Sequence, residues 1–103
     1  MAPLADEPLR ATTLAVVATN VALSKTHLTK LAMMANTGAA RAINPYHTQG
    51  DGDQMFAVST ARSKADVSLT ALGAIAAEVV ADAVVRAAKM ATSVPGWTAI
   101  RDF

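Results

Sequence analysis

The chain has 103 residues, of which 52% are hydrophobic and 17% charged, with a net charge of +1 and no cysteine. A chain of this length forms one domain at most, and its near-neutral charge argues against nucleic acid as a partner. The lack of cysteine excludes disulfides, thiolate metal sites and cysteine nucleophiles, and it is compatible with the reducing cytoplasm, which is the location we expect.

The composition is strongly apolar for so short a chain, with a mean hydropathy of +0.31. A domain of this size buries only about 60% of its unfolded surface, so exposed apolar faces are expected if it stands alone. We therefore expect a partner chain or an oligomer. The acidic start, broken by Pro3 and Pro8, is unlike a secretory signal. The apolar run at 67–77 is shorter than the roughly 18 residues of a membrane span, so no membrane partner is predicted.

The first part of the chain divides into a leader and a strand. Residues 1–11 contain two prolines and no hydrophobic periodicity, which indicates a flexible leader before the folded part. The run at 12–19 is apolar on both alternating sets of positions and partly β-branched. This pattern is typical of a strand covered on both faces, so a central strand is predicted.

The next segment, residues 25–43, repeats apolar residues at steps of three and four, which predicts an amphipathic helix. Ser24 precedes it and offers the hydroxyl expected of an N-cap. Gly38 lies inside this helix, where glycine costs about 1 kcal/mol relative to alanine. We therefore expect a neighbouring backbone to approach closely at Gly38. Pro45 marks the end of the helical region.

Turn-forming residues fill 44–53, and the segment 54–60 has the length and composition of a second strand. A polar connection at 62–66 leads to a long helix over 67–91. Its polar positions form one narrow stripe: Glu78, Asp82, Arg86 and Lys89. The rest of that helix is apolar, so it must pack on a sheet on one side and on another helix or subunit on the other.

The order strand, helix, strand, helix predicts an α/β fold that is half of a layered sandwich. A turn at 94–97 closes the chain, with Trp97 as an anchoring aromatic. Two strands are too few for an independent sheet, so we expect the missing strands from another chain or from another part of a larger precursor.

Thr12 and Thr13 open the first strand, and threonine is common in strands without any chemical role. Thr12 also fits a nucleophile at a new N-terminus. Once the bond between Ala11 and Thr12 is cut, the Thr12 hydroxyl lies beside its own α-amine. The ordinary pKa of that amine, about 7.7–8.0, lets it act as a base. One residue would then supply both nucleophile and base.

Asp51 and Asp53 flank Gly52 just before the second strand. Such a triplet is usually a turn. Two carboxylates two residues apart on an entering strand also point to the same side, where they could orient and stabilise the ammonium or hydroxyl of a nucleophile. These residues alone leave both interpretations open, a structural turn and a pair of acids that faces a nucleophile.

No metal or other cofactor is predicted. His27 and His47 have no second ligand at metal-binding spacing, and we assign them to solvent or to a loop. Four other side chains are interpreted as packing residues: Met33, Met34, Met55 and Phe56.

Four segments carry a family resemblance: 12–20, 42–48, 51–60 and 72–80. Together they resemble the C-terminal part of the autoprocessing aminopeptidases related to L-aminopeptidase/D-amidase and the nylon-oligomer hydrolases. The resemblance covers nearly everything from Thr12 to about residue 91. It implies a precursor that cuts itself into a large α chain and a small β chain, whose new N-terminal residue attacks amide bonds.

By this resemblance, residues 12–103 are the β-subunit part of a single domain, a four-layer αββα sandwich of the N-terminal-nucleophile-hydrolase type. A partner α chain completes the sandwich, and αβ units join into a larger homo-oligomer. Thr12 matches the nucleophile, Asp51 and Asp53 match the acidic pair that faces it, and autocleavage falls between Ala11 and Thr12. The implied substrate is a small amide or peptide.

The sequence departs from the family pattern at Ala11, where nylon-hydrolase-like members carry Asn. The α portion, with its further catalytic side chains, lies outside this sequence, so the chain alone is expected to be inactive. Two alternatives stay open: an acyltransferase of the ornithine-acetyltransferase type, and a non-catalytic fragment in which the bond before Thr12 is never cut. Peptides, D-amino-acid amides, β-peptides and nylon oligomers all remain candidate substrates.

Overall fold

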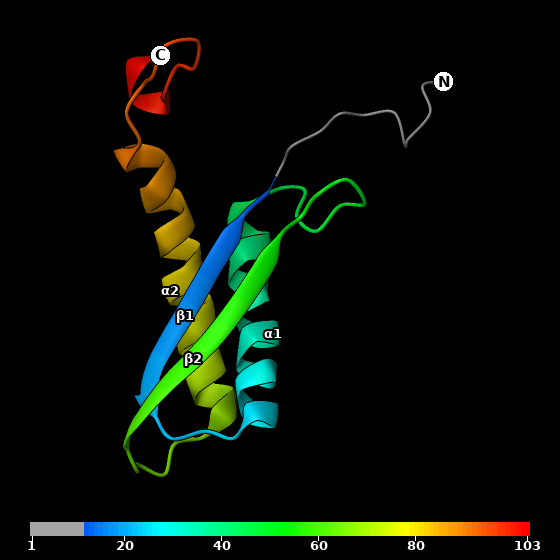
Figure 1. Ribbon diagram of the computed structural model, residues 1–103, viewed down its shortest axis with the longest axis vertical. Coiled ribbons are helices and arrows are strands. Elements are labelled where there is room, and N and C mark those ends of the chain that lie inside the picture. The colour runs from blue at the N-terminus through cyan, green and yellow to red at the C-terminus, as the bar shows by residue number, and fades with distance from the viewer. Residues whose placement is uncertain (1–11) are drawn as a thin grey trace.

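The computed structural model describes residues 12–103, and the predicted leader at 1–11 lies outside the described residues. The elements are two strands, two long helices and a short 3-10 helix: β1 (Leu14–Val21), α1 (Lys25–Ala42), β2 (Gln54–Ser63), α2 (Leu69–Met90) and η2 (Ile100–Asp102). Figure 1 shows the two strands side by side in front of the two helices. The predicted α/β class and the order of the elements are confirmed.

Side-chain caps set where both helices begin. The Ser24 hydroxyl accepts a hydrogen bond from the His27 N–H, as predicted, and the Ser68 hydroxyl accepts one from the Ala71 N–H. Each bond satisfies one of the amide groups that an α-helix leaves without a partner in its first turn. The cap at Ser68 moves the start of α2 from the predicted residue 67 to residue 69.

The two strands form a parallel pair, joined by α1 as the crossover. Regular pairing runs as far as Thr19 opposite Ser59, and then a bulge lets Val21 pair with Ser63. The bulge includes Ala61 at φ 57°, in the left-handed region. The predicted end of β2 at residue 60 was therefore wrong, because the strand resumes its pairing beyond the bulge and ends at Ser63. The polar connection to α2 is shorter as a result.

Helices α1 and α2 lie together on one face of the sheet (Figure 1) and form the core there. Five buried residues make up its centre: Leu31, Ala35, Ala39, Ala76 and Val80. The small side chains let the helices approach closely, and a Cβ atom at Gly38 would collide with the carbonyl oxygen of Ala77. The close approach predicted at Gly38 is confirmed.

The opposite face of the sheet is apolar and exposed. Leu14 is 69% exposed and Val16 is 63% exposed, and Phe56 and Val58 continue the same face on β2. A strand covered on both faces was predicted, and residues 12–103 cover only one of them. The α2 helix also exposes apolar side chains, including Ile75. Exposed apolar surface of this kind often marks a site of interaction with another protein.

The C-terminal segment folds into a turn beyond the end of α2. Val94 and Trp97 form a bridge, as expected for the predicted turn, and the Arg101 guanidinium donates to the carbonyls of Lys89 and Met90 at the end of the helix. Trp97 is 77% exposed. Its predicted role as an anchor is therefore wrong for the described residues, because the turn carries the ring away from the core.

Candidate functional site

The beginnings of the two strands and the loop at 44–53 meet at one end of the molecule. Parallel strands start at the same edge of a sheet, and here the Gln54 N–H donates to the Thr13 carbonyl at 2.9 Å. Figure 1 shows this loop beside the start of β1. The fold therefore brings Thr12 and the Asp51–Asp53 segment together, although about 40 residues separate them in the sequence.

Asp53 joins the loop to the first strand. The residue is 4% exposed, and its Oδ1 atom accepts from the Thr13 N–H at 2.7 Å while Oδ2 accepts from the His47 N–H at 3.0 Å. Burial raises the pKa of Asp53, but the hydrogen bonds from the His47 and Thr13 amides, together with the nearby His47 charge and the Thr13 hydroxyl, hold the pKa below its ordinary value. The carboxylate therefore stays ionised at neutral pH and fixes the backbone next to Thr12.

Asp51 organises the loop itself. Its Oδ2 atom accepts from the Thr48 hydroxyl at 2.6 Å and from the Thr48 N–H at 3.3 Å, and its own N–H donates to the Thr48 carbonyl at 3.1 Å. These contacts run from Asp51 back to the residue three positions earlier and close a turn over residues 48–51. Among the hydrogen bonds of residues 12–103, none joins either Asp51 or Asp53 to the Thr12 hydroxyl.

Thr12 lies directly against the acidic loop. A Cβ atom built on Gly52 would lie 3.1 Å from Thr12 Oγ1, so the hydroxyl rests on the glycine between the two acids. Thr12 is exposed, whereas Thr13, the neighbour held by Asp53, is half-buried. Ala11, which precedes the predicted cleavage point, lies outside the described residues.

Tyr46 and Asn36 take part in this region and were missed from the sequence. The Tyr46 hydroxyl donates to Asn36 Oδ1 at 3.0 Å, which ties the loop to α1. His47 is exposed, and its ring lies 4.5 Å from that of Tyr46 between centroids. The only hint in the sequence was an aromatic residue within a turn-rich segment. His27 lies exposed at the start of α1, as expected.

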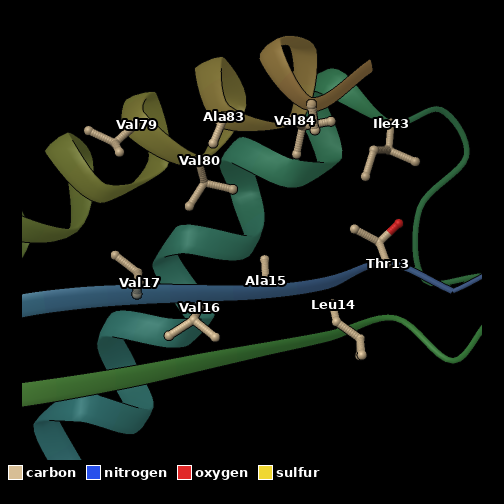
Figure 2. A pocket seen from close by; sticks show the side chains of 11 residues that line it. Thr13, Leu14, Ala15, Val16, Val17, Ile43, Val79, Val80, Ala83 and Val84 are labelled. Carbon is tan, nitrogen blue, oxygen red and sulfur yellow. The ribbon is translucent and has the colours of Figure 1, made fainter. Parts of the chain in front are cut away.

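An apolar groove of about 520 Å³ lies between β1 and α2 (Figure 2). Thr13 and Ile43 line the end of the groove near the loop, and Val79, Val80 and Val84 line its wall on α2. Thr12 does not line it. Because its lining carries almost no polar group, we interpret the groove as packing space and not as a place for amide chemistry.

Two findings concern metals and membranes. Within residues 12–103, no three side chains of His, Asp or Glu gather closely enough to hold a metal ion. None of the helices in that part of the chain is long and apolar enough to cross a membrane.

The comparisons with known proteins agree on one family. The sequence model of peptidase family S58 matches residues 4–101. The chain is 42% identical over 89 residues to a 6-aminohexanoate-oligomer endohydrolase of Kocuria sp. (strain KY2), covering 76% of this chain and 25% of that protein. It is 40% identical over 89 residues to a protein of the same name from Paenarthrobacter ureafaciens, with the same coverage.

A mycobacterial protein is similar to the same extent. An uncharacterized aminopeptidase of Mycobacterium leprae (strain TN) is 41% identical over 98 residues, covering 82% of this chain and 27% of that protein. The chain thus spans about a quarter of the length of these curated relatives. On the family match and these identities, the chain belongs to peptidase family S58, as its sequence predicted.

Proposed function

We propose that this chain is the small, C-terminal part of an enzyme that hydrolyses amide bonds, with Thr12 as the nucleophile. The observation that carries the proposal is the position of Thr12, whose hydroxyl rests on Gly52 between two carboxylates at the start of two parallel strands. Relatives named 6-aminohexanoate-oligomer endohydrolase and aminopeptidase support it, because both names denote hydrolysis of bonds between amino acids.

Cleavage of the Ala11–Thr12 bond would give Thr12 a free α-amine. That amine accepts the proton of the hydroxyl as the oxygen attacks the substrate carbonyl, and then passes the proton to the departing amine of the substrate. The acyl group is left as an ester on Thr12. Water then attacks this ester and gives a proton to the α-amine. The resulting ammonium passes that proton to the departing Thr12 oxygen, so the acid is released and the free hydroxyl and amine are restored.

The acidic loop holds this centre in place. Asp53 fixes the Thr13 amide, so the backbone next to the nucleophile cannot turn away, and its negative charge favours the ammonium form of Thr12 that arises during the reaction. Asp51 closes the turn around Gly52 through Thr48. We assign Thr12, Asp51 and Asp53 as the catalytic group of this chain.

The rest of the enzyme would come from a larger α chain of the same precursor. The apolar outer face of the sheet needs a second layer, and the chain is only about a quarter as long as its relatives. A second sheet packed on that face would give the four-layer αββα sandwich, and remaining exposed apolar helix surface would join αβ units into a larger oligomer.

The nucleophile is tested by substitution in the assembled enzyme. Thr12→Ala should abolish hydrolysis of an amide substrate, whereas Thr12→Ser keeps a hydroxyl and should retain part of it. Thr29→Ala is the matched control, because that exposed hydroxyl bonds only to the Lys25 carbonyl of its own helix. Full amidase activity in Thr12→Ala would refute the assignment.

A further inference from the structure

Tyr46 anchors the loop of the candidate site to α1. Its hydroxyl donates to Asn36 Oδ1 at 3.0 Å, and its half-buried ring packs against the core between the helices and the sheet. Burial raises the pKa of Tyr46, and the Asp53 carboxylate raises it further, so the hydroxyl keeps its proton and stays a donor at neutral pH. The beginning of the loop is thus fixed by a directional contact.

The next residue, His47, connects this anchor to the site. Its N–H donates to Asp53 Oδ2, and the other carboxylate oxygen of Asp53 accepts from the Thr13 N–H. Three hydrogen bonds therefore lead from α1 through the loop to the residue beside Thr12. His47 has φ 58°, a left-handed conformation that a non-glycine residue keeps only where its surroundings hold it. The contacts of Tyr46 and Asp53 supply that restraint on both sides.

We propose that Tyr46 is a positioning residue, whose hydrogen bond to Asn36 holds the His47 backbone where it orients Asp53 against Thr13. The consequence for catalysis rests on the proposed function, because only there does the position of Thr12 matter. The link through the loop itself does not depend on any activity.

Amide exchange in the full chain tests the link. Tyr46→Phe keeps the ring and removes only the hydroxyl, and Asn36→Ala removes its acceptor. We expect each variant to speed exchange of the His47 and Thr13 amides by about two- to tenfold, the effect of one ordinary hydrogen bond. The double variant should speed it no further, because both changes remove the same bond.

Thr37→Ala is the control, since it removes a hydroxyl that bonds only to the Met34 carbonyl on the same helix. It should leave both exchange rates unchanged. The proposal would be overturned by unaltered exchange in Tyr46→Phe. It would also be overturned if the two single variants' increases in exchange rate added up in the double variant.

Kinetics of the assembled enzyme separate positioning from simple stabilisation. Tyr46→Phe should lower kcat and the rate of Ala11–Thr12 cleavage by about the same factor as it speeds exchange, with KM changed by less than about twofold. A lower Tm with unchanged kcat would overturn the positioning role. If the wild-type enzyme shows neither cleavage nor turnover while exchange responds as expected, the proposed function fails and the link through Tyr46 stands.

Discussion

Substitution of Gly38 by alanine tests the packing on which the whole fold depends. In an isolated helix this change stabilises by about 1 kcal/mol, because alanine is the better helix former. Here the new Cβ atom would meet the backbone carbonyl of Ala77 on the facing helix, which cannot rotate away. Overpacking of a close-packed core costs about 1–3 kcal/mol, and a rigid backbone neighbour places Gly38 at the upper end. We expect a net destabilisation of about 2 kcal/mol.

Gly73→Ala is the matched comparison within α2. A Cβ atom there would also be too close to Met34 Sδ and Cε, but these atoms end a flexible side chain and can move aside. The fixed neighbour that remains, Met34 Cβ, lies at 3.0 Å, a much smaller overlap than the one with the Ala77 carbonyl at Gly38. We therefore expect a change within about 1 kcal/mol of zero. Urea unfolding followed by circular dichroism measures the free energy of unfolding of both variants. In thermal unfolding, the Tm of Gly38→Ala should be lower than that of wild type by about 8–16 °C. A Gly38→Ala variant as stable as wild type, or more stable, would refute the argument from close helix contact.

Two further predictions follow from the site and from the exposed face of the sheet. Because the folded pKa of Asp53 is lowered, its ionised form stabilises the fold above its ordinary pKa of about 3.9, and this stability is lost as the pH falls through the lower folded pKa. Asp53→Asn should therefore lower the Tm at pH 7 and flatten its decline below pH 4; equal pH profiles for wild type and variant would contradict this. Val16→Lys should prevent association with the α chain in size-exclusion chromatography, since it places a charge on the exposed apolar face, whereas Thr29→Lys on the outer side of α1 should not. Normal assembly of Val16→Lys would show that this face remains uncovered.

The local features of the fold could be predicted because they depend on neighbours in the sequence. Ser24 was recognisable as a cap from the helical periodicity that follows it, and Gly38 as a contact point from its cost in a helix. The end of β2 could not be predicted, because the bulge at Ala61 arises from pairing with β1 and leaves no clear local pattern. The exposure of Trp97 likewise depends on where the last turn directs the chain.

The candidate site could be predicted in part. Its three proposed catalytic residues stand at recognisable motif positions, and the structure places Thr12 against the loop that carries the two acids. The sequence could not distinguish the two carboxylates, because both lie in one turn-forming triplet. Folding buries Asp53 beneath two backbone amides and leaves Asp51 to close the turn. The hydrogen bond between Tyr46 and Asn36 could not be predicted either, because it depends on the path that the loop takes over α1.

In the proposed enzyme, Thr12 becomes an N-terminal nucleophile beside a larger companion chain. Intact mass spectrometry of the native protein under denaturing conditions tests it most directly, since it records every chain present. We expect a small species that begins at Thr12 together with a larger α chain. A single species that still carries residues 1–11, with no companion, would contradict it, because Thr12 would then have no free α-amine.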